Sequence, residues 1–233
     1  MITQPINKIL FFDIETVGLF RSYEELEKNN EMLLKQFHNY FDWFLKRFPE
    51  DKELPKEQVF VNRAALVPEF SKIVCASFAF VTPDGKVHKQ TISGDDEKQV
   101  LFEINQLFNK VQKSDFWLCG HNVKNFDIPH LLKRMVINGI KPSTLLPSYE
   151  TKPWEIRAID TMDVWKFGNP FGLSSLELMC AAMGLPSSKE GEITGNRVHE
   201  AYWEHNQLNL IVEYCERDVL VLVELIKKLK ELK

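Results

Sequence analysis

The chain has 233 residues, of which 44% are hydrophobic and 27% are charged, and its formal net charge is −4. Such values are ordinary for a globular protein, and the length suits one large domain or two small ones. The acidic balance argues against a protein that coats nucleic acid through a broad basic surface. The four cysteines form no C-x-x-C pair, so we expect reduced core residues, as in a reducing compartment.

The sequence contains neither of the usual membrane signals. No apolar run reaches the roughly 18 residues of a membrane span. The first twenty residues also lack the basic, apolar and small-residue pattern of a signal peptide. We therefore expect a cytoplasmic protein with no membrane partner.

Strand and helix patterns alternate in the first half of the chain. Residues 7–13 are predicted to form a strand, and residues 22–48 carry apolar side chains mostly three or four positions apart, which predicts a helix. Residues 71–81 and 86–93 read as a hairpin around a Thr-Pro-Asp-Gly turn. Residues 95–111 again have helical spacing.

The second half continues this alternation. Residues 116–120 form a short apolar strand pattern, and a predicted helix begins after Asp127 and ends at Gly139. Residues 157–165 can hold a fifth strand, and helices are expected over 172–184 and 206–232. Strands alternating with helices, plus one hairpin, predict an α/β layered domain with a mixed sheet.

The first strand ends, in this prediction, with two carboxylates. In the stretch FFDIET, Asp13 and Glu15 have the same parity and so project from one face of the strand. They follow apolar residues on both faces, which is typical of a central strand. Two adjacent carboxylates repel each other unless they are protonated or bridged by a cation. A solvated strand end is the alternative interpretation.

A second acidic pattern follows the strand FWLC. Asp127 directly precedes a predicted helix with Pro129 in its first turn, which is also the pattern of a simple helix N-cap. The preceding Gly-His-Asn-x-x-x-Phe is less ordinary. It places Asn122 and the aromatic Phe126 beside the carboxylate.

The third pattern lies in the last predicted helix. Asp218 falls within an apolar stripe at helical spacing, where a charge is costly unless it is paired or bound to metal. Tyr214 lies one turn earlier on the same face. Read alone, Tyr214 is also compatible with a core aromatic. Together, Asp13, Glu15, Asp127 and Asp218 make an oxygen-rich cage for hard cations such as Mg²⁺ or Mn²⁺.

In chain order, Asp13-Ile-Glu15, Asn122-x-x-x-Phe126-Asp127 and Tyr214-x-x-x-Asp218 match the three exonuclease motifs of the DEDD superfamily. The chain resembles its tyrosine subclass, because Glu213 stands where the histidine subclass has its His. It is similar to the proofreading domain of family B DNA polymerases, and particularly to stand-alone bacterial polymerase-B-like exonucleases. No polymerase region follows, so proofreading in cis is not expected.

The resemblance implies a ribonuclease-H-like fold over one domain, residues 1–233, with a helical insertion at about 20–60 after the first strand. It also implies a 3′→5′ exonuclease that uses two divalent ions, Mg²⁺ or Mn²⁺, and releases nucleoside 5′-monophosphates from the 3′ end of single-stranded DNA. Asp13, Glu15 and Asp218 are assigned to one metal, with Asp13 bridging to a second. Asp127 holds that second metal, and Tyr214 orients the attacking water.

The remaining candidates concern substrate and partners. Thr16, Asn122 and Phe126 are expected to grip the terminal nucleotide, the Phe by stacking. The aromatics of residues 37–48 can serve helix packing, a substrate platform or a protein partner of the insertion. Asp160 is a candidate supporting carboxylate, and His121 reads as a polar loop residue. Three basic residues near the second motif are candidates to meet phosphates or are simply solvated: Lys124, Lys133 and Arg134.

Two rival functions stay open at this point. Ribonuclease D-like exoribonucleases share the tyrosine motif, and nothing in the sequence reads a 2′-hydroxyl unambiguously. A binding module on the same fold, without turnover, is the alternative from another functional class. The presence of all four carboxylates and the tyrosine argues against it.

Overall fold

The computed structural model describes residues 2–187 and 193–231. Within these ranges the strands form one five-stranded sheet in the order β3-β2-β1-β4-β5. The central strand β1 is antiparallel to β2 and parallel to β4, while β2 and β3 form the predicted hairpin and β4 and β5 are parallel. The predicted α/β class with a mixed sheet is confirmed. The strands are β1 (Ile9–Gly18), β2 (Ser71–Val81), β3 (Val87–Ser93), β4 (Trp117–Gly120) and β5 (Ala158–Asp160).

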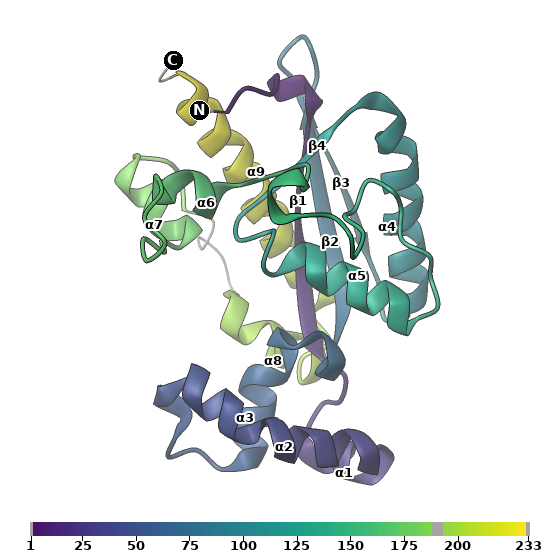
Figure 1. The fold of residues 1–233 in the computed structure, drawn as a ribbon. Helices are drawn as coiled ribbons and strands as arrows, with labels where there is room; N and C mark the ends of the chain where they lie inside the picture. Colours follow the sequence, from purple (N-terminus) through teal and green to yellow (C-terminus); the bar gives the residue numbers. More distant parts are fainter. Residues whose placement is uncertain (1, 188–192, 232–233) are drawn as a thin grey trace.

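Helices cover both faces of the sheet (Figure 1). Leu10 and Phe12 of β1 pack into the cluster that includes α4 (Glu97–Val111) and α5 (Asp127–Ile137). The alternate residues Ile9 and Phe11 pack against α9 (Leu208–Glu231). The two parities of β1 therefore face two cores, as the sequence predicts.

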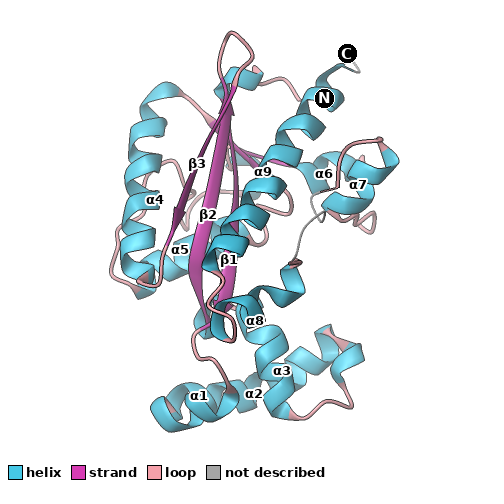
Figure 2. Cartoon of the chain, turned by 180° about the vertical axis from the view of Figure 1, so that it is seen from behind, coloured by secondary structure: helices cyan, strands magenta, loops and turns pink. Residues whose placement is uncertain are grey.

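Two shorter helices that follow β5 in the chain lie beside α9 in both ribbon views (Figures 1 and 2). They are α6 (Thr161–Lys166) and α7 (Leu176–Ala182). The sequence predicted a strand and helix at these positions but not the separate helix α6. Asp160 ends β5 and its side chain caps α6 by accepting a hydrogen bond from the Met162 N–H, which explains why the strand stops there.

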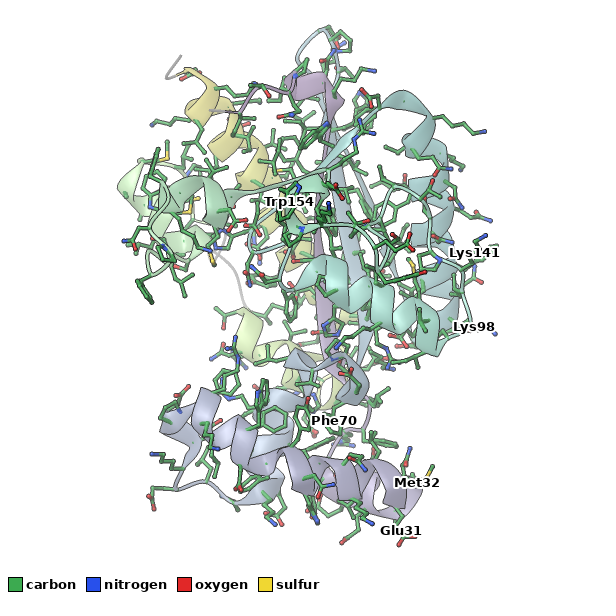
Figure 3. The ribbon with its side chains drawn as sticks, in the orientation of Figure 1. Glu31, Met32, Phe70, Lys98, Lys141 and Trp154 are labelled. Atoms are coloured by element: carbon green, nitrogen blue, oxygen red, sulfur yellow. The ribbon has the colours of Figure 1, made fainter. Side chains whose placement is uncertain are left out.

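The helical insertion forms its own apolar cluster beyond the carboxyl end of β1 (Figure 2). It contains α1 (Tyr23–Asn29), α2 (Glu31–Arg47) and α3 (Lys56–Arg63). The single helix predicted over 22–48 is wrong, because the side chain of Asn30 accepts a bond from the Leu33 N–H and starts a new helix. Phe37 and Phe44 are fully buried, as packing predicts, whereas Tyr40 and Trp43 are exposed. Phe70, labelled in Figure 3, packs into this cluster directly before β2.

The first strand is longer than predicted. It continues beyond Asp13 and Glu15 to Gly18, with an irregular register between Glu15 and Thr16. Its end is held by α8 (Val198–Trp203), a helix that the sequence analysis did not predict. His199 Nδ1 accepts the Gly18 N–H at 3.1 Å, and Trp203 Nε1 donates to the Gly18 carbonyl at 3.1 Å. The two carboxylates therefore project from within a held strand and not from a solvated tip.

No helix among the described residues combines the length and the apolar character that crossing a membrane requires.

Candidate active site

Carboxylates from three elements converge beside β1. Asp13 and Glu15 project from β1, Asp127 begins α5, and Asp218 lies on the buried side of α9. Ligand atoms of Asp13, Glu15 and Cys215 all lie within 4.8 Å of one another. The structure therefore brings together side chains that are separated by up to about two hundred positions in the sequence.

The cluster is electrostatically unfavourable without a cation. Burial raises the pKa of Asp13 well above its usual range, and the charges of Asp127, Glu15 and Asp218 raise it further. Burial also raises the pKa of Glu15, with Asp218 as the largest repulsive carboxylate. No hydrogen bond joins the Glu15 carboxylate to another residue in the described ranges, although its side chain is only 9% exposed. Buried carboxylates in such a group are stabilised by a bound cation.

The donor set fits a hard divalent metal. Carboxylate oxygens are the ligands that Mg²⁺ and Mn²⁺ prefer in proteins. Asp13, Glu15, Asp127 and Asp218 together supply more oxygens than a single ion requires from protein. The thiol of Cys215 also lies 3.5 Å from Asp13 Oδ2, but burial raises its pKa strongly and favours the neutral thiol. In the sequence, the one sign that Cys215 would lie near the site was its place on the same apolar stripe as Asp218.

Asp127 has a different local role from the helix cap that its position suggests. The N-cap of α5 is Phe126, which makes no side-chain capping bond, and Asp127 is the first residue of the helix. Asp127 Oδ1 instead accepts the backbone N–H of Ile14 at 3.2 Å. Burial raises the pKa of Asp127 to about 7, while this hydrogen bond opposes the rise. The carboxylate is thus directed toward the strand that carries Asp13 and Glu15.

Tyr214 and Asp218 lie one turn apart on the buried side of α9. Burial raises the pKa of Tyr214 above its ordinary value, and the charges of Asp218, Glu15 and Asp13 raise it further. Tyr214 is therefore a neutral phenol at physiological pH. The nearby Gly195 approaches closely, because a Cβ at this position would lie 3.5 Å from the Tyr214 hydroxyl.

The three predicted substrate contacts have different surroundings. Asn122 and Phe126 are partly exposed on the loop that leads to Asp127, and Asn122 has a positive φ of 57°. The Phe126 ring lies 5.1 Å from that of His130 and packs partly against the core. The hydroxyl of Thr16 donates to the Ala65 carbonyl at 2.8 Å. Thr16 thus fastens β1 to the end of the insertion, and its hydroxyl is already engaged.

Asp160 supports the loop of the second motif. Its buried carboxylate accepts the backbone N–H groups of Asn122 at 2.9 Å and Lys124 at 3.1 Å, besides capping α6. His121 Nδ1 lies 2.9 Å from Thr161 Oγ1, so it contacts the same helix start. The loop before Asp127 is therefore fixed by its neighbour in the sheet, which the motif spacing alone does not reveal.

One basic residue near the second motif is buried, contrary to the expectation of a phosphate contact. The Arg134 guanidinium donates from Nε to Glu97 Oε1 at 2.8 Å, and only 4% of the residue is exposed. Lys133 pairs with Glu69 at 3.0 Å, and Lys124 pairs with Asp163 at 3.4 Å. Arg134 could contact a phosphate only by leaving Glu97, and a buried ion pair that loses one partner is strongly destabilised. Of the three basic residues, Arg134 is therefore the one that is no longer a candidate phosphate contact.

Two sequence comparisons relate the chain to known proteins. A family model described as "Predicted 3′-5′ exonuclease related to the exonuclease domain of PolB" matches residues 65–225, more than half of the chain. The chain is 25% identical over 174 residues to the PolC-type DNA polymerase III of Ureaplasma parvum serovar 3. That alignment covers 73% of this chain and 9% of the polymerase, so the chain spans a small part of that relative.

Solved structures show the same fold. The family B DNA polymerase of the archaeon Pyrobaculum calidifontis matches with a TM-score of 0.60 and 18% identity, over 97% of this chain and 25% of the polymerase. Exonuclease I of E. coli, solved with a 5cy-dT13 oligonucleotide, matches with a TM-score of 0.50 and 13% identity. The match covers 97% of this chain and 40% of exonuclease I. The predicted ribonuclease-H-like arrangement of sheet and helices is thereby confirmed.

Proposed function

The chain belongs to the family of predicted 3′→5′ exonucleases related to the exonuclease domain of PolB, and we propose that it shortens single-stranded DNA from the 3′ end by two-metal hydrolysis. It is a 3′→5′ exonuclease domain, and domains of this type use divalent metal ions. The observation that carries the proposal is that ligand atoms of Asp13 and Glu15 lie within 4.8 Å of each other. Asp127 is bonded to the backbone between them, and the charge of Asp218 acts on both. We interpret residues 1–233 as one such domain with the helical insertion at about 20–60.

Each carboxylate receives a role in this proposal. Asp13, Glu15 and Asp218 would hold one ion, and Asp13 and Asp127 would hold the second. When bound, a pair of Mg²⁺ or Mn²⁺ ions supplies a nucleophilic water and stabilises the entering and leaving oxygens of an in-line displacement. Burial, and then repulsion from the other carboxylates, raises the pKa values of Asp13 and Glu15, which supports a site made for cations.

Tyr214 orients the attacking water in this proposal and does not remove its proton. The support is its raised pKa, since a phenol that stays neutral at physiological pH is a poor general base. Its place one turn before Asp218, on the buried side of α9, sets the phenol beside one proposed metal ligand. The products are nucleoside 5′-monophosphates.

The terminal nucleotide is held, we propose, by the loop before Asp127. Phe126 offers a partly exposed ring for stacking, and the Asn122 side chain lies on the same loop. The Asn122 amide oxygen accepts a bond from Asn125 at 3.1 Å, which leaves its amino group as the donor for substrate. Because the Thr16 hydroxyl already binds Ala65, Thr16 contacts the nucleotide through other atoms.

Single-stranded DNA is the proposed substrate, and RNA is the second candidate. The DNA proposal is supported by the fold shared with exonuclease I, which was solved with dT13, and with a DNA polymerase. A protein partner of the helical insertion stays a prediction. The exposed side chains of Tyr40 and Trp43 offer a surface for such a partner. A module without turnover is disfavoured by the complete set of carboxylates.

Matched DNA and RNA oligonucleotides, labelled at the 5′ end and incubated with Mg²⁺, test the substrate class. The proposal predicts that the DNA shortens faster and releases nucleoside 5′-monophosphates, identified by mass spectrometry. Faster decay of the RNA would establish the exoribonuclease alternative. Intact oligonucleotides of both kinds, in Mg²⁺ and in Mn²⁺, would establish the binding module.

A further inference from the structure

The hairpin strand β3 forms one edge of the sheet. Within the described ranges it pairs with β2 and with no other strand, and both ribbon views place it on the same side of the molecule as α4 (Figures 1 and 2). The strand at the opposite edge, β5, has only three residues, whereas β3 has seven. A long exposed edge strand is a template for pairing with a further strand.

The hydrogen bonds of the hairpin show which backbone groups of β3 face outward. The Thr82 N–H donates to the Lys86 carbonyl at 2.9 Å, before β3 begins. The Gly94 N–H donates to the Val74 carbonyl at 3.0 Å, just after β3 ends. Bonded and non-bonded residue pairs alternate along an antiparallel ladder, and the register of β2 with β3 is regular. The N–H and C=O groups that point away from β2 therefore belong to Val87, Lys89, Thr91 and Ser93.

The strand β3 lacks the usual protections of a sheet edge. It contains no proline, and it pairs with β2 without a bulge. Its lysine, Lys89, forms an ion pair with Glu216 of α9, so the ammonium group lies on the α9 face and does not project across the edge. The Thr91 hydroxyl donates to the same carboxylate at 2.8 Å. A second strand can therefore approach this edge without meeting an uncompensated charge.

The residues of β3 are complementary to a second copy of the same strand. In an antiparallel pair that uses all seven residues, Gln90 faces Gln90 of the second copy. Lys89 then faces Thr91, and Val87 faces Ser93. Every outward N–H and C=O group thus meets an outward group of the other copy. No like charges stand opposite each other in this register, as a stable strand pair requires.

A groove beside this edge has matching side chains on α4. The groove has a volume of about 340 Å³ and is lined by residues of β3 and α4, among them Phe102, which is 48% exposed. Glu103 and Lys110 also line it, about two helical turns apart. Glu103 in addition lines a smaller hollow beside Ser93, which Lys110 does not reach. The acid therefore lies toward the carboxyl end of β3 and the lysine toward its amino end.

A two-fold axis at Gln90 exchanges these two ends. It places the two α4 helices antiparallel on the same face of the joined sheet. Glu103 of each copy then faces Lys110 of the other, so the charges beside the strand pair are complementary as well. The backbone pattern and the charges of α4 thus favour the same register independently of each other.

We propose that two copies of this chain associate through β3, so that their sheets join into one continuous sheet with an ion pair between the α4 helices on each side of the axis. The strand β1, which carries Asp13 and Glu15, lies two strands inward from this edge. The association leaves the candidate active site free, and the inference does not rest on the proposed function.

Sedimentation equilibrium of the full chain tests the association directly. The wild type is expected at about 54 kDa, twice the 27.2 kDa of one chain. Lys89→Pro removes an outward N–H and leaves the bonds between β2 and β3 in place. It should raise the dimer Kd about thirtyfold, which corresponds to about 2 kcal/mol, because two symmetry-related hydrogen bonds are lost. Lys89→Gln, which keeps the N–H and loses the ion pair with Glu216, is the matched control and stays a dimer.

Charge reversal on α4 tests the same register without altering the strand. Glu103→Lys and Lys110→Glu should each raise the dimer Kd about tenfold, because two symmetry-related pairs become repulsive. The double variant restores the complementary charges and should return to the wild-type Kd. Lys98→Glu reverses a charge on the same helix outside the groove and should keep the wild-type Kd.

Amide hydrogen exchange locates the contact on individual residues. The N–H groups of Lys89 and Thr91 should gain protection as the protein concentration rises, whereas that of Gln90, which is bonded to β2 in either state, should not change. A wild type with the mass of one chain at every concentration would overturn the inference. A dimer that Lys89→Pro and both charge reversals leave intact, with no change in the exchange of Lys89 and Thr91, would overturn it as well.

Discussion

The Asp127 carboxylate accepts the backbone N–H of Ile14 at 3.2 Å, although the two residues are 113 positions apart in the chain. Ile14 stands between Asp13 and Glu15, so this bond places the carboxylate of α5 against the strand that bears the other two. The fold itself therefore holds these proposed metal ligands in place, which lowers the cost of ordering them when an ion binds.

Asp127→Asn separates the charge of this residue from its hydrogen bond. The amide oxygen can still accept the Ile14 N–H, so the fold is kept, but one metal ligand loses its charge. We expect kcat for a single-stranded oligonucleotide to fall about hundredfold or more, a barrier increase of about 2.7 kcal/mol. Asp127→Ala, which also loses the bond, should in addition lower the free energy of unfolding by about 1 kcal/mol. Unchanged kcat in the Asn variant would contradict the assignment.

The same variant reports, through the pH dependence of stability, the electrostatic cost of burying Asp127 among other carboxylates. The pKa of Asp127 is raised to about 7 in the folded protein, whereas an unfolded Asp titrates near about 4. Between these values the folded state binds more protons than the unfolded state, so this contribution to stability is lost as pH rises. In chelator, the Tm of Asp127→Asn minus that of wild type should therefore increase from pH 4 to pH 7.

Buried histidines such as His130, whose pKa is lowered to about 3, have the opposite effect on stability as pH rises. The variant and the wild type share these histidines, so the difference between their Tm values cancels this effect. With Mg²⁺ at pH 8 the wild type should have the higher Tm, because the metal stabilises its ionised carboxylate cluster more than that of the Asp127→Asn variant. Each kcal/mol corresponds to about 2–4 °C in a chain of this size. A difference that stays constant with pH would show that Asp127 is not buried beside like charges.

Asp160→Ser tests whether Asp160 positions the catalytic loop. Serine can still cap α6, as Asp160 does through the Met162 N–H, but it is too short to reach Asn122 and Lys124. We expect kcat/KM to fall about hundredfold, the cost of a displacement of about 1 Å. Asp96→Ser is the matched control, since Asp96 caps α4 away from the carboxylates. Equal activity losses in both variants would indicate a general effect on the fold.

Tyr214→Phe removes the hydroxyl while keeping the buried ring. An orienting role predicts a fall in kcat between about tenfold and hundredfold, at the lower limit of what proton transfer contributes, with KM little changed. Tyr202→Phe serves as control, because that hydroxyl binds Asp95 at 2.7 Å on another surface. The control should lose about 1 kcal/mol of stability and keep its kcat. A larger loss of kcat in Tyr214→Phe, together with a new dependence of kcat on alkaline pH, would identify Tyr214 as a general base.

The central architecture could be predicted because it depends on local periodicity. The two parities of β1 reach two different cores, and the stripe of α9 carries Tyr214 and Asp218 inward, as the spacing indicates. The turn before β3 and the alternation of strands and helices were visible for the same reason. These features follow from residues that are close together in the sequence.

The sequence patterns misled where the surroundings of a residue depend on a partner that is distant in the sequence. The helix cap, which the sequence left open as an alternative for Asp127, is not formed, because this carboxylate accepts the Ile14 N–H. Arg134 has the pattern of a solvated helix residue, but Glu97 draws it into the interior. The helix over 22–48 was broken by the side chain of Asn30, whose cap competes with continued helix. The first strand was predicted to end at Asp13, because α8, which holds Gly18, was not predicted.

The most direct test of the central claim is digestion of a 5′-labelled single-stranded DNA in Mn²⁺, with and without chelator, by wild type and Asp13→Asn. The account predicts a ladder that shortens from the 3′ end only for the wild type and only when metal is free. Shortening that persists in chelator, or in Asp13→Asn at the wild-type rate, would contradict a metal-dependent exonuclease site at Asp13, Glu15, Asp127 and Asp218.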